Sequence, residues 1–299
     1  MADDVRAEFE RLASEVRPKL HRYCARMTGS AVDGEDIVQD ALIKALAALP
    51  KVGVMVNPEG WLFRIAHNTA LDFLRGRSRG PIIQNDEALD MIAAPDSPDQ
   101  DREVAATSLR TFLRLPALQR SAVILKDVLG HSLEEVASIT GASEAAAKSA
   151  LQRGRVRLRE FAREPADVSL PMLSDEMRAR LIKYVDGFKT GDFDTVRAML
   201  ADDVKLDLVA KLRKQGKSEV GEYFARYAAC EQWAFAAGVV DGRPAMLVYD
   251  REASLETPAY FVALDFDGDR VVSIHDFLFA RYAMDGVDSS PLNPAPRSQ

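Results

Sequence analysis

The sequence has 299 residues, with 39 basic and 46 acidic side chains, a net charge of −7 and 47% hydrophobic residues. This composition is typical of a soluble globular protein, and the length suits two or three domains. It excludes a membrane-spanning helix, because no run of about 18 apolar residues occurs. The N-terminus lacks the apolar stretch of a secretion signal, so we predict a cytoplasmic protein. Cys24 and Cys230 lie far apart, outside any Cys or His cluster, which predicts no disulfide, metal site or cofactor.

The first part of the chain is predicted to be helical. From Val5 to Arg79, apolar residues recur every three or four positions. Residues 80–103 hold seven acidic side chains, one basic side chain and three prolines, a composition typical of an extended acidic linker. Four more helices are predicted after this linker, at residues 103–114, 117–129, 133–139 and 143–161.

After a break with prolines at 165 and 171, the pattern changes to that of an α+β domain. Helices are predicted at residues 173–190, 193–200 and 218–229. Alternating runs predict strands at residues 204–209, 233–240, 245–249, 259–266 and 270–279, with hairpin turns at 241–243 and 267–269.

The segment 133–151 has the spacing of a helix-turn-helix. Ala137 is small where two helices would cross, Gly141 suits a turn with positive φ, and Ser143 can cap the second helix. That helix continues into a stretch, 148–163, with six basic residues and one acidic residue. An ordinary pair of amphipathic helices with a solvated basic face is the alternative. The residues predicted to face DNA are Ser143, Glu144, Ala145, Lys148, Ser149, Gln152, Arg153 and Arg155, with the arginines nearer the phosphates.

Residues 115–130, together with the helix-turn-helix, resemble region four of an extracytoplasmic-function (ECF) sigma factor. Two further segments resemble region two of the same family: 33–45 its polymerase-binding helix, and 57–77 its promoter-opening segment. The matches occur in the family's order and cover about residues 5–163. The acidic linker falls where the family has its interdomain connector.

The resemblance implies specific roles for residues of region two. Docking on core RNA polymerase is implied for Asp36, Ile37, Val38, Gln39 and Asp40, with the two aspartates pairing with basic residues and Ile37 and Val38 supplying apolar area. A capped amphipathic helix is the alternative. Trp61 is expected in the domain core, and contact with nucleic acid is implied for Arg64, Asn68, Arg75, Arg77 and Arg79, unless they form a solvated helix face.

Residues 191–204 and 241–249, with the order of two helices, a strand, a helix and a four-stranded meander, resemble the SnoaL-like fold. That fold is a curved sheet wrapped on a long helix to make a cone. Three roles are left open for it here: catalysis, a ligand-sensing pocket, and a clamp on the helical domains. The candidate pocket residues are Asp207, Tyr249, His275 and Asp276.

We therefore predict a multi-domain protein: two all-α sigma domains, the second with the helix-turn-helix, and a C-terminal α+β SnoaL-like cone. Its predicted parts are region 2 (5–79), the acidic linker (80–103), region 4 (104–163) and the SnoaL-like domain (172–288). The predicted function is that of a sigma factor that binds core RNA polymerase and promoter DNA, is modulated by its own C-terminal domain, and is not an enzyme. Alternatives are a polymerase-independent helix-turn-helix regulator with a ligand-sensing domain, and a SnoaL-like enzyme with a DNA-binding head. A small-molecule or protein effector of the C-terminal domain is left open.

Overall fold

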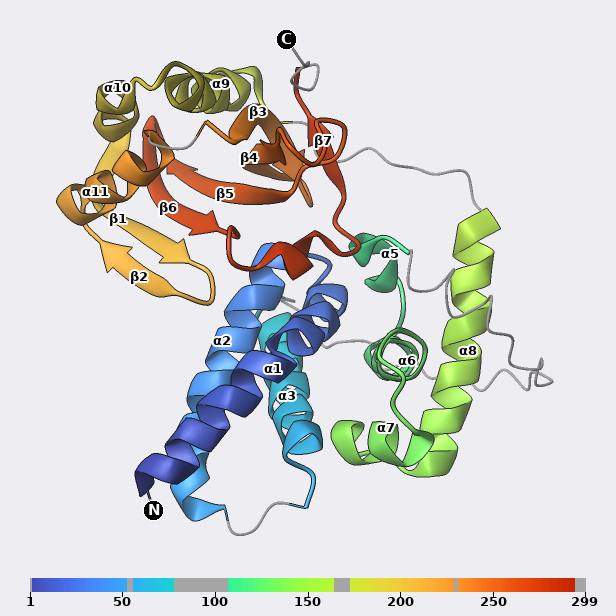
Figure 1. The fold of residues 1–299 in the computed structure, drawn as a ribbon. Helices are drawn as coiled ribbons and strands as arrows, with labels where there is room; N and C mark the ends of the chain where they lie inside the picture. The colour runs from blue at the N-terminus through green and yellow to red at the C-terminus, as the bar shows by residue number, and fades with distance from the viewer. Residues whose placement is uncertain (1, 53–55, 78–106, 164–172, 229–230, 294–299) are drawn as a thin grey trace. The chain divides into compact units, whose positions relative to one another are not determined.

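The computed structural model describes residues 2–52, 56–77, 107–163, 173–228 and 231–293 (Figure 1). The chain divides into two compact units, Met1–Asp167 and Val168–Gln299, here called unit 1 and unit 2. Unit 1 is helical and unit 2 combines helices with a sheet, so the predicted fold class is confirmed. The predicted acidic linker, Arg79 and Cys230 lie outside the described residues.

Unit 1 contains three long helices followed by a group of shorter helices and one further long helix. The first three are α1 (Ala2–Thr28), α2 (Ala31–Ala48) and α3 (Pro58–Arg77), with a short 3-10 turn at Leu49–Lys51. The others are α5 (Leu109–Phe112), α6 (Ala117–Val123), a π-helical turn at Ile124–Val128, α7 (Leu133–Thr140) and α8 (Glu144–Arg163).

The helices on the two sides of the predicted linker share one hydrophobic core in unit 1. The ring of Phe63 on α3 packs edge-on against Tyr23 on α1 at 5.9 Å and against His131 at 4.9 Å between centroids. The sequence pattern separates these helices into two domains, because periodicity identifies the buried face of each helix but not the helix that covers it.

Buried polar groups also join the two sets of helices. The guanidinium of Arg120 donates to the carbonyl oxygen of Met27 at 2.6 Å, at the end of α1. It also donates to two carbonyl oxygens of the residues that directly precede α6. The hydroxyl of Tyr23 is hydrogen-bonded to His67 Nδ1 at 2.7 Å and donates to Ser121 Oγ at 3.2 Å. Burial lowers the pKa of His67 to about 4, so this imidazole is neutral near pH 7.

The predicted helix-turn-helix is formed by α7 and α8. Helix α7 begins with a capping box, in which Ser132 Oγ accepts from the Glu135 amide at 3.1 Å and the Glu135 carboxylate accepts from the Ser132 amide at 2.8 Å. It ends at Gly141, whose φ of 74° is the left-handed conformation that glycine adopts without strain. Ser143 Oγ then accepts from the Ala146 amide at 3.2 Å and caps α8.

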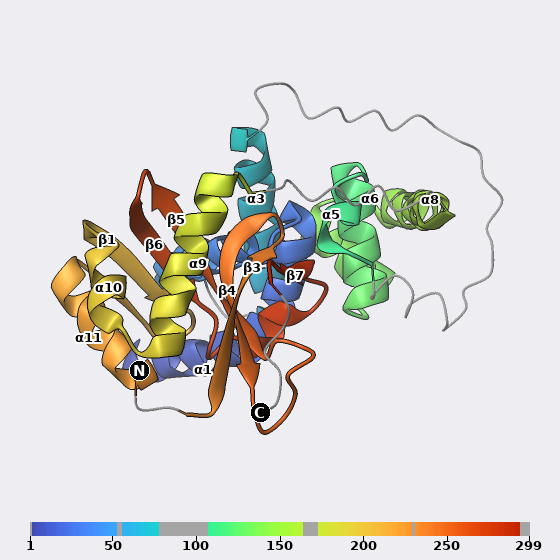
Figure 2. The ribbon, with the colours of Figure 1, turned by 90° about the horizontal axis from the view of Figure 1, so that it is seen from above.

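Unit 2 is a single sheet with helices packed on one of its faces, as the crossing of α9 over the strands in Figure 2 shows. Its strand order is β2-β1-β6-β5-β4-β3-β7, and all neighbours are antiparallel except β1 and β6. The helices are α9 (Asp175–Thr190), α10 (Phe193–Ala198) and α11 (Lys217–Ala228). The strands are β1 (Leu200–Leu208), β2 (Leu212–Gln215), β3 (Trp233–Val240), β4 (Arg243–Asp250), β5 (Tyr260–Asp267), β6 (Arg270–Asp276) and β7 (Ser289–Pro291).

The predicted order of elements in unit 2 is confirmed, with the edge strands β2 and β7 as additions. Asp241 and Gly242 both have positive φ, 50° and 82°, at the β3–β4 turn, where the Asp-Gly pair predicts such a hairpin. The edge strands were missed because β2 is short and polar and β7 has three residues, too few for an alternating pattern.

Candidate functional site

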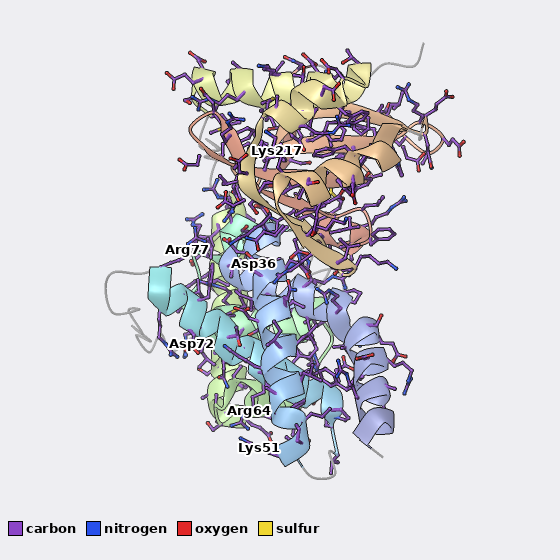
Figure 3. All side chains as sticks on the ribbon, turned by 90° about the vertical axis from the view of Figure 1, so that its left-hand side faces the viewer. Asp36, Lys51, Arg64, Asp72, Arg77 and Lys217 are labelled. Carbon is purple, nitrogen blue, oxygen red and sulfur yellow. The ribbon has the colours of Figure 1, made fainter. Side chains whose placement is uncertain are left out.

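Helix α2 presents a mixed acidic and apolar surface. Asp36 and Gln39 are half-buried, Asp40 is exposed, and they lie on the same side of the helix as Ile43 and Leu46. Figure 3 places Asp36 on this helix. Ile43 is 57% exposed and Leu46 is 37% exposed, which is unusual for large aliphatic side chains.

The buried side of α2 corrects one detail of the sequence analysis. Ile37 and Val38 are 2% and 0% exposed and belong to the core of unit 1, so they do not supply apolar area at the surface. That area comes instead from Ile43 and Leu46, which the sequence analysis did not single out. Asp36, Asp40, Ile43 and Leu46 follow one another at steps of three or four residues along one face, and this series is the signal that identifies Ile43 and Leu46.

Helix α3 carries an exposed polar stripe along its length. Arg64, Asn68, Asp72 and Arg75 recur at helical spacing and are all exposed, and Figure 3 shows Arg64, Asp72 and Arg77 following the helix. Arg75 Nη1 donates to Asp72 Oδ1 at 2.7 Å, an exposed ion pair that water and salt weaken.

The end of α3 and its core side hold side chains with intramolecular roles. Arg77 donates to the buried carboxylate of Asp33 at 2.5 Å, and its guanidinium lies over the ring of Phe73 at 5.4 Å. Trp61 packs against the core of unit 1, as predicted. The polar stripe therefore lies on a helix whose opposite side is packed in the core of unit 1, and Arg64 is the exposed basic residue of the stripe nearest the start of α3.

The N-terminal part of α8 is open to solvent. Ser143, Glu144, Ala145 and Lys148 are exposed, and Ser149 and Gln152 are half-buried. On the opposite side, Ala147 and Ala150 are fully buried where α8 packs in the core. A helix with its first turns exposed and its back face packed on the preceding helices can place short side chains in a groove of duplex DNA.

The arginines that follow on α8 are held by other side chains. Arg153 Nη1 donates to Ser149 Oγ at 2.6 Å, and Arg157 Nη1 donates to Gln119 Oε1 at 3.1 Å. Arg155 forms a bidentate pair with Asp127, at 2.9 and 2.6 Å, in which the two side chains are only 12% and 1% exposed. Arg155 is predicted from the sequence to lie near phosphates, whereas in the structure its guanidinium is paired with Asp127 inside unit 1.

The four candidate residues of unit 2 are divided between the two faces of the sheet. Asp207 and His275 are paired in register on neighbouring strands and point away from the helix-covered face, on which Leu206, Leu208 and Ile274 lie. Asp207 also forms an ion pair with Arg213 at 2.8 Å. Tyr249 alternates with core residues of β4 and lies on the same side as His275.

Asp276 alone of the four belongs to the interior under the helices. It is 0% exposed, its Oδ2 accepts from the Tyr227 hydroxyl at 2.7 Å, and its Oδ1 accepts from the Leu278 amide at 2.8 Å. Burial raises the pKa of Asp276 to about 7. Tyr227 was not predicted, because its role depends on α11 packing over the end of β6.

Within the described part of the chain, no group of three or more His, Cys, Asp or Glu side chains is arranged to hold a metal ion. In the same residues, every helix is too short or too polar to cross a lipid bilayer.

Two known protein families match the sequence of unit 1. The Sigma-70 region 2 family matches residues 12–80, and the Sigma-70 region 4 family matches residues 109–158. The ECF RNA polymerase sigma factor SigG of Mycobacterium tuberculosis is 28% identical over 93% of this chain and 83% of its own length. SigM of the same organism is 31% identical over 51% of this chain and 76% of its own length. The crystal structure of M. tuberculosis SigJ is 22% identical and covers 89% of this chain and 95% of that chain, with a TM-score of 0.35.

Proposed function

Because this chain belongs to the ECF family of RNA polymerase sigma factors, we propose that it binds core RNA polymerase and directs transcription initiation from specific promoters. Region 2 spans residues 5–79, the acidic linker 80–103, region 4 residues 104–163 and the SnoaL-like domain 172–288. The protein acts in the cytoplasm, and we assign it no catalytic activity.

The observation that carries this proposal is the surface of α2. Asp36, Gln39 and Asp40 supply polar and negative groups, and Ile43 and Leu46 supply exposed apolar area beside them. Such a surface fits a partner that combines basic and apolar side chains, because charge complementarity orients the encounter and apolar burial holds it. Core RNA polymerase is the partner that the family assignment provides.

Two other surfaces face promoter DNA in this proposal. The exposed stripe of α3, with Arg64 and Asn68, contacts the separated strands as the promoter opens. The first turns of α8, with Glu144, Lys148 and Gln152, read base edges of an upstream duplex element, and Arg153 lies towards the phosphates. Arg155 supports α8 through its pair with Asp127.

Unit 2 modulates this activity in the proposal. The helical regions have their own core, and the second unit has another, so the C-terminal domain is an addition to the promoter-recognition machinery. Deleting the residues after about 170 is expected to change run-off transcription over a titration of core polymerase. An unaltered dose response would contradict modulation by unit 2 while leaving the assignment of unit 1 intact.

The direct test measures binding of the full chain to core RNA polymerase. Leu46→Asp is expected to weaken binding by about tenfold or more. The new carboxylate would be buried without a partner in the interface with core polymerase, which costs about 1–3 kcal/mol. The matched control is Leu212→Asp, since Leu212 lies on unit 2 and has the same 37% exposure as Leu46. Equal affinity for Leu46→Asp and the unaltered protein, with both folded, would refute the α2 surface as the polymerase-binding site.

A further inference from the structure

The hairpin formed by β1 and β2 carries basic and apolar side chains at one end of the sheet of unit 2. Strand β2 lies at an edge of the sheet (Figure 1), and three of the four residues at 211–214 are basic. Leu208 is paired with Leu212 of β2 and with Asp276 at the end of β6. The segment that follows β6 therefore starts beside the tip of the hairpin, and its Phe279 is 48% exposed.

The tip of this hairpin is a tight turn that is hydrogen-bonded to its surroundings. Ala210 has a φ of 64°, in the left-handed region that favours glycine. The amide of Val209 donates to the carbonyl oxygen of Asp276 at 3.0 Å, and the amide of Lys211 donates to the carbonyl oxygen of Leu208 at 2.9 Å. These two hydrogen bonds fix the backbone of the tip to the end of β6.

Two cations lie over aromatic rings at this end of the sheet. Nζ of exposed Lys211 is 4.9 Å from the centroid of the Phe279 ring. Exposed Arg281 follows Phe279 by two residues, and its guanidinium lies 5.6 Å from the ring centroid of half-buried Trp233. Two residues of extended chain span at most about 7 Å, so the two pairs of ring and cation are neighbours.

The exposed side chains of this end of the sheet are basic or apolar. In the described part of the chain, no carboxylate forms an ion pair with Lys211. Arg213 pairs with Asp207 on the adjacent strand at 2.8 Å, but its side chain remains 55% exposed. We call the following set the tip surface: Lys211, Leu212, Arg213, Phe279 and Arg281.

The composition of the tip surface restricts the kind of partner that it fits. Three basic side chains require an anionic partner, because charge complementarity orients association and like charges repel. The half-exposed ring of Phe279 requires a partner with a flat apolar face, since large apolar side chains are usually buried. Single-stranded nucleic acid combines both properties, because every nucleotide brings a phosphate and a base whose face is open for stacking.

We propose that the tip surface of unit 2 binds single-stranded DNA. The Phe279 ring stacks on one base, and Lys211, Arg213 and Arg281 contact the phosphates on either side of it. Duplex DNA fits less well, because its bases are already stacked on one another. The proposal deepens the modulatory role proposed for unit 2 and rests on it, since the opening of a promoter by a sigma factor supplies the separated strands.

The first test isolates the stacking ring. The full-length protein is titrated into a fluorescent oligothymidylate of about 16 nucleotides, and its anisotropy is followed. An Arg64→Ala/Asn68→Ala background removes the single-strand contacts proposed for α3. In this background Phe279→Leu keeps an apolar side chain without a ring and is expected to weaken binding at least about fivefold. Phe279→Tyr keeps the ring and is expected to bind within about twofold of the background protein. Equal affinity of Phe279→Leu and the background protein would overturn the proposal.

The second test counts a phosphate contact in the same background. Lys211→Ala is expected to reduce the slope of log affinity against log salt concentration by about 0.7, the contribution of one phosphate of a single strand. The matched control is Lys183→Ala, which removes another exposed lysine of unit 2, on α9, and is expected to leave the slope unchanged. Equal slopes for the two variants would contradict a phosphate contact by Lys211.

Photo-crosslinking with 5-iodouracil in the oligonucleotide locates the bound strand on the full-length protein. The crosslink is expected in the tryptic fragment 271–281, which contains Phe279, and at least about fivefold less of it with the same strand annealed to its complement. Crosslinks only outside this fragment, or equal yields from single strand and duplex, would overturn the proposal. Because these measurements contain no polymerase, their failure leaves the proposed sigma-factor function intact and is distinguishable from its failure.

Discussion

Replacing Arg155 decides whether this guanidinium supports the fold or holds DNA. In the structure it forms two hydrogen bonds to Asp127, whose side chain is only 1% exposed. Arg155→Met keeps much of the apolar stem but removes both hydrogen bonds from Arg155 to the buried Asp127 carboxylate. Breaking a buried pair in this way typically costs about 3–5 kcal/mol. In Arg155→Met/Asp127→Leu both charges are removed, and the stability is expected to recover to within about 1 kcal/mol of the starting protein.

The assay is equilibrium unfolding in urea, followed through a tryptophan confined to one unit. The sequence has two tryptophans, Trp61 in unit 1 and Trp233 in unit 2, so Trp233→Phe leaves a probe of unit 1 alone. With a urea dependence of about 2 kcal/mol per molar, Arg155→Met is expected to lower the midpoint by roughly 2 M. The reasoning is refuted if the midpoint does not change and the salt dependence of duplex binding instead becomes shallower by about one phosphate contact.

Three further outcomes are expected. Lys148→Ala is expected to change the base preference of duplex binding. Arg153→Ala is expected to weaken binding to every duplex and to reduce the slope of log affinity against log salt concentration by about one. Identical losses of Lys148→Ala on all sequences in a binding titration would contradict the role of Lys148. Gly154→Ala places a Cβ 2.6 Å from Val123 Cγ2 and 3.1 Å from a backbone oxygen, and calorimetry should show a loss of about 1–3 kcal/mol in unit 1. Because folding raises the pKa of Asp276 from 3.8 to about 7, its favourable contribution is complete below about pH 4 and is lost as the pH rises through about 7, by at most about 4 kcal/mol. Urea titrations of unit 2 should therefore show a pH dependence that is weaker in Asp276→Asn, and equal slopes for the two proteins would count against it.

The positions of most helices and strands could be predicted because short patterns of neighbouring residues determine where they begin and end. The capping box at Ser132 and Glu135, the left-handed Gly141 and the cap at Ser143 are all set by residues within one helical turn, and α7 and α8 begin and end where these residues predict. The same is true of the Asp-Gly turn after β3. Edge strand β2 forms a hairpin with β1 but is short and polar, and the three-residue β7 pairs with the distant β3, so neither leaves such a local pattern.

The candidate surfaces were predicted less completely. Arg64 and Lys148 are exposed, as their helical positions predict, but Ile37 and Val38 are core residues while Ile43 is at the surface. Ile37, Val38 and Ile43 all lie on one amphipathic helix, α2. Sequence periodicity alone does not show which side of this helix its neighbours cover.

The sequence by itself determined the family, the order of the helices and the α+β character of the second unit, because motif spacing and hydrophobic periodicity are properties of contiguous residues. Only the tertiary structure decided that helices on both sides of the linker share a core, that Arg155 is paired with Asp127, and that Asp276 accepts a hydrogen bond from Tyr227 of α11. Such contacts join residues that are far apart in the sequence: Arg155 and Asp127 are 28 positions apart, and Tyr23 and Ser121 are 98 positions apart. Their physical cause is packing and desolvation, which act on neighbours in space and leave no mark in the spacing of the chain.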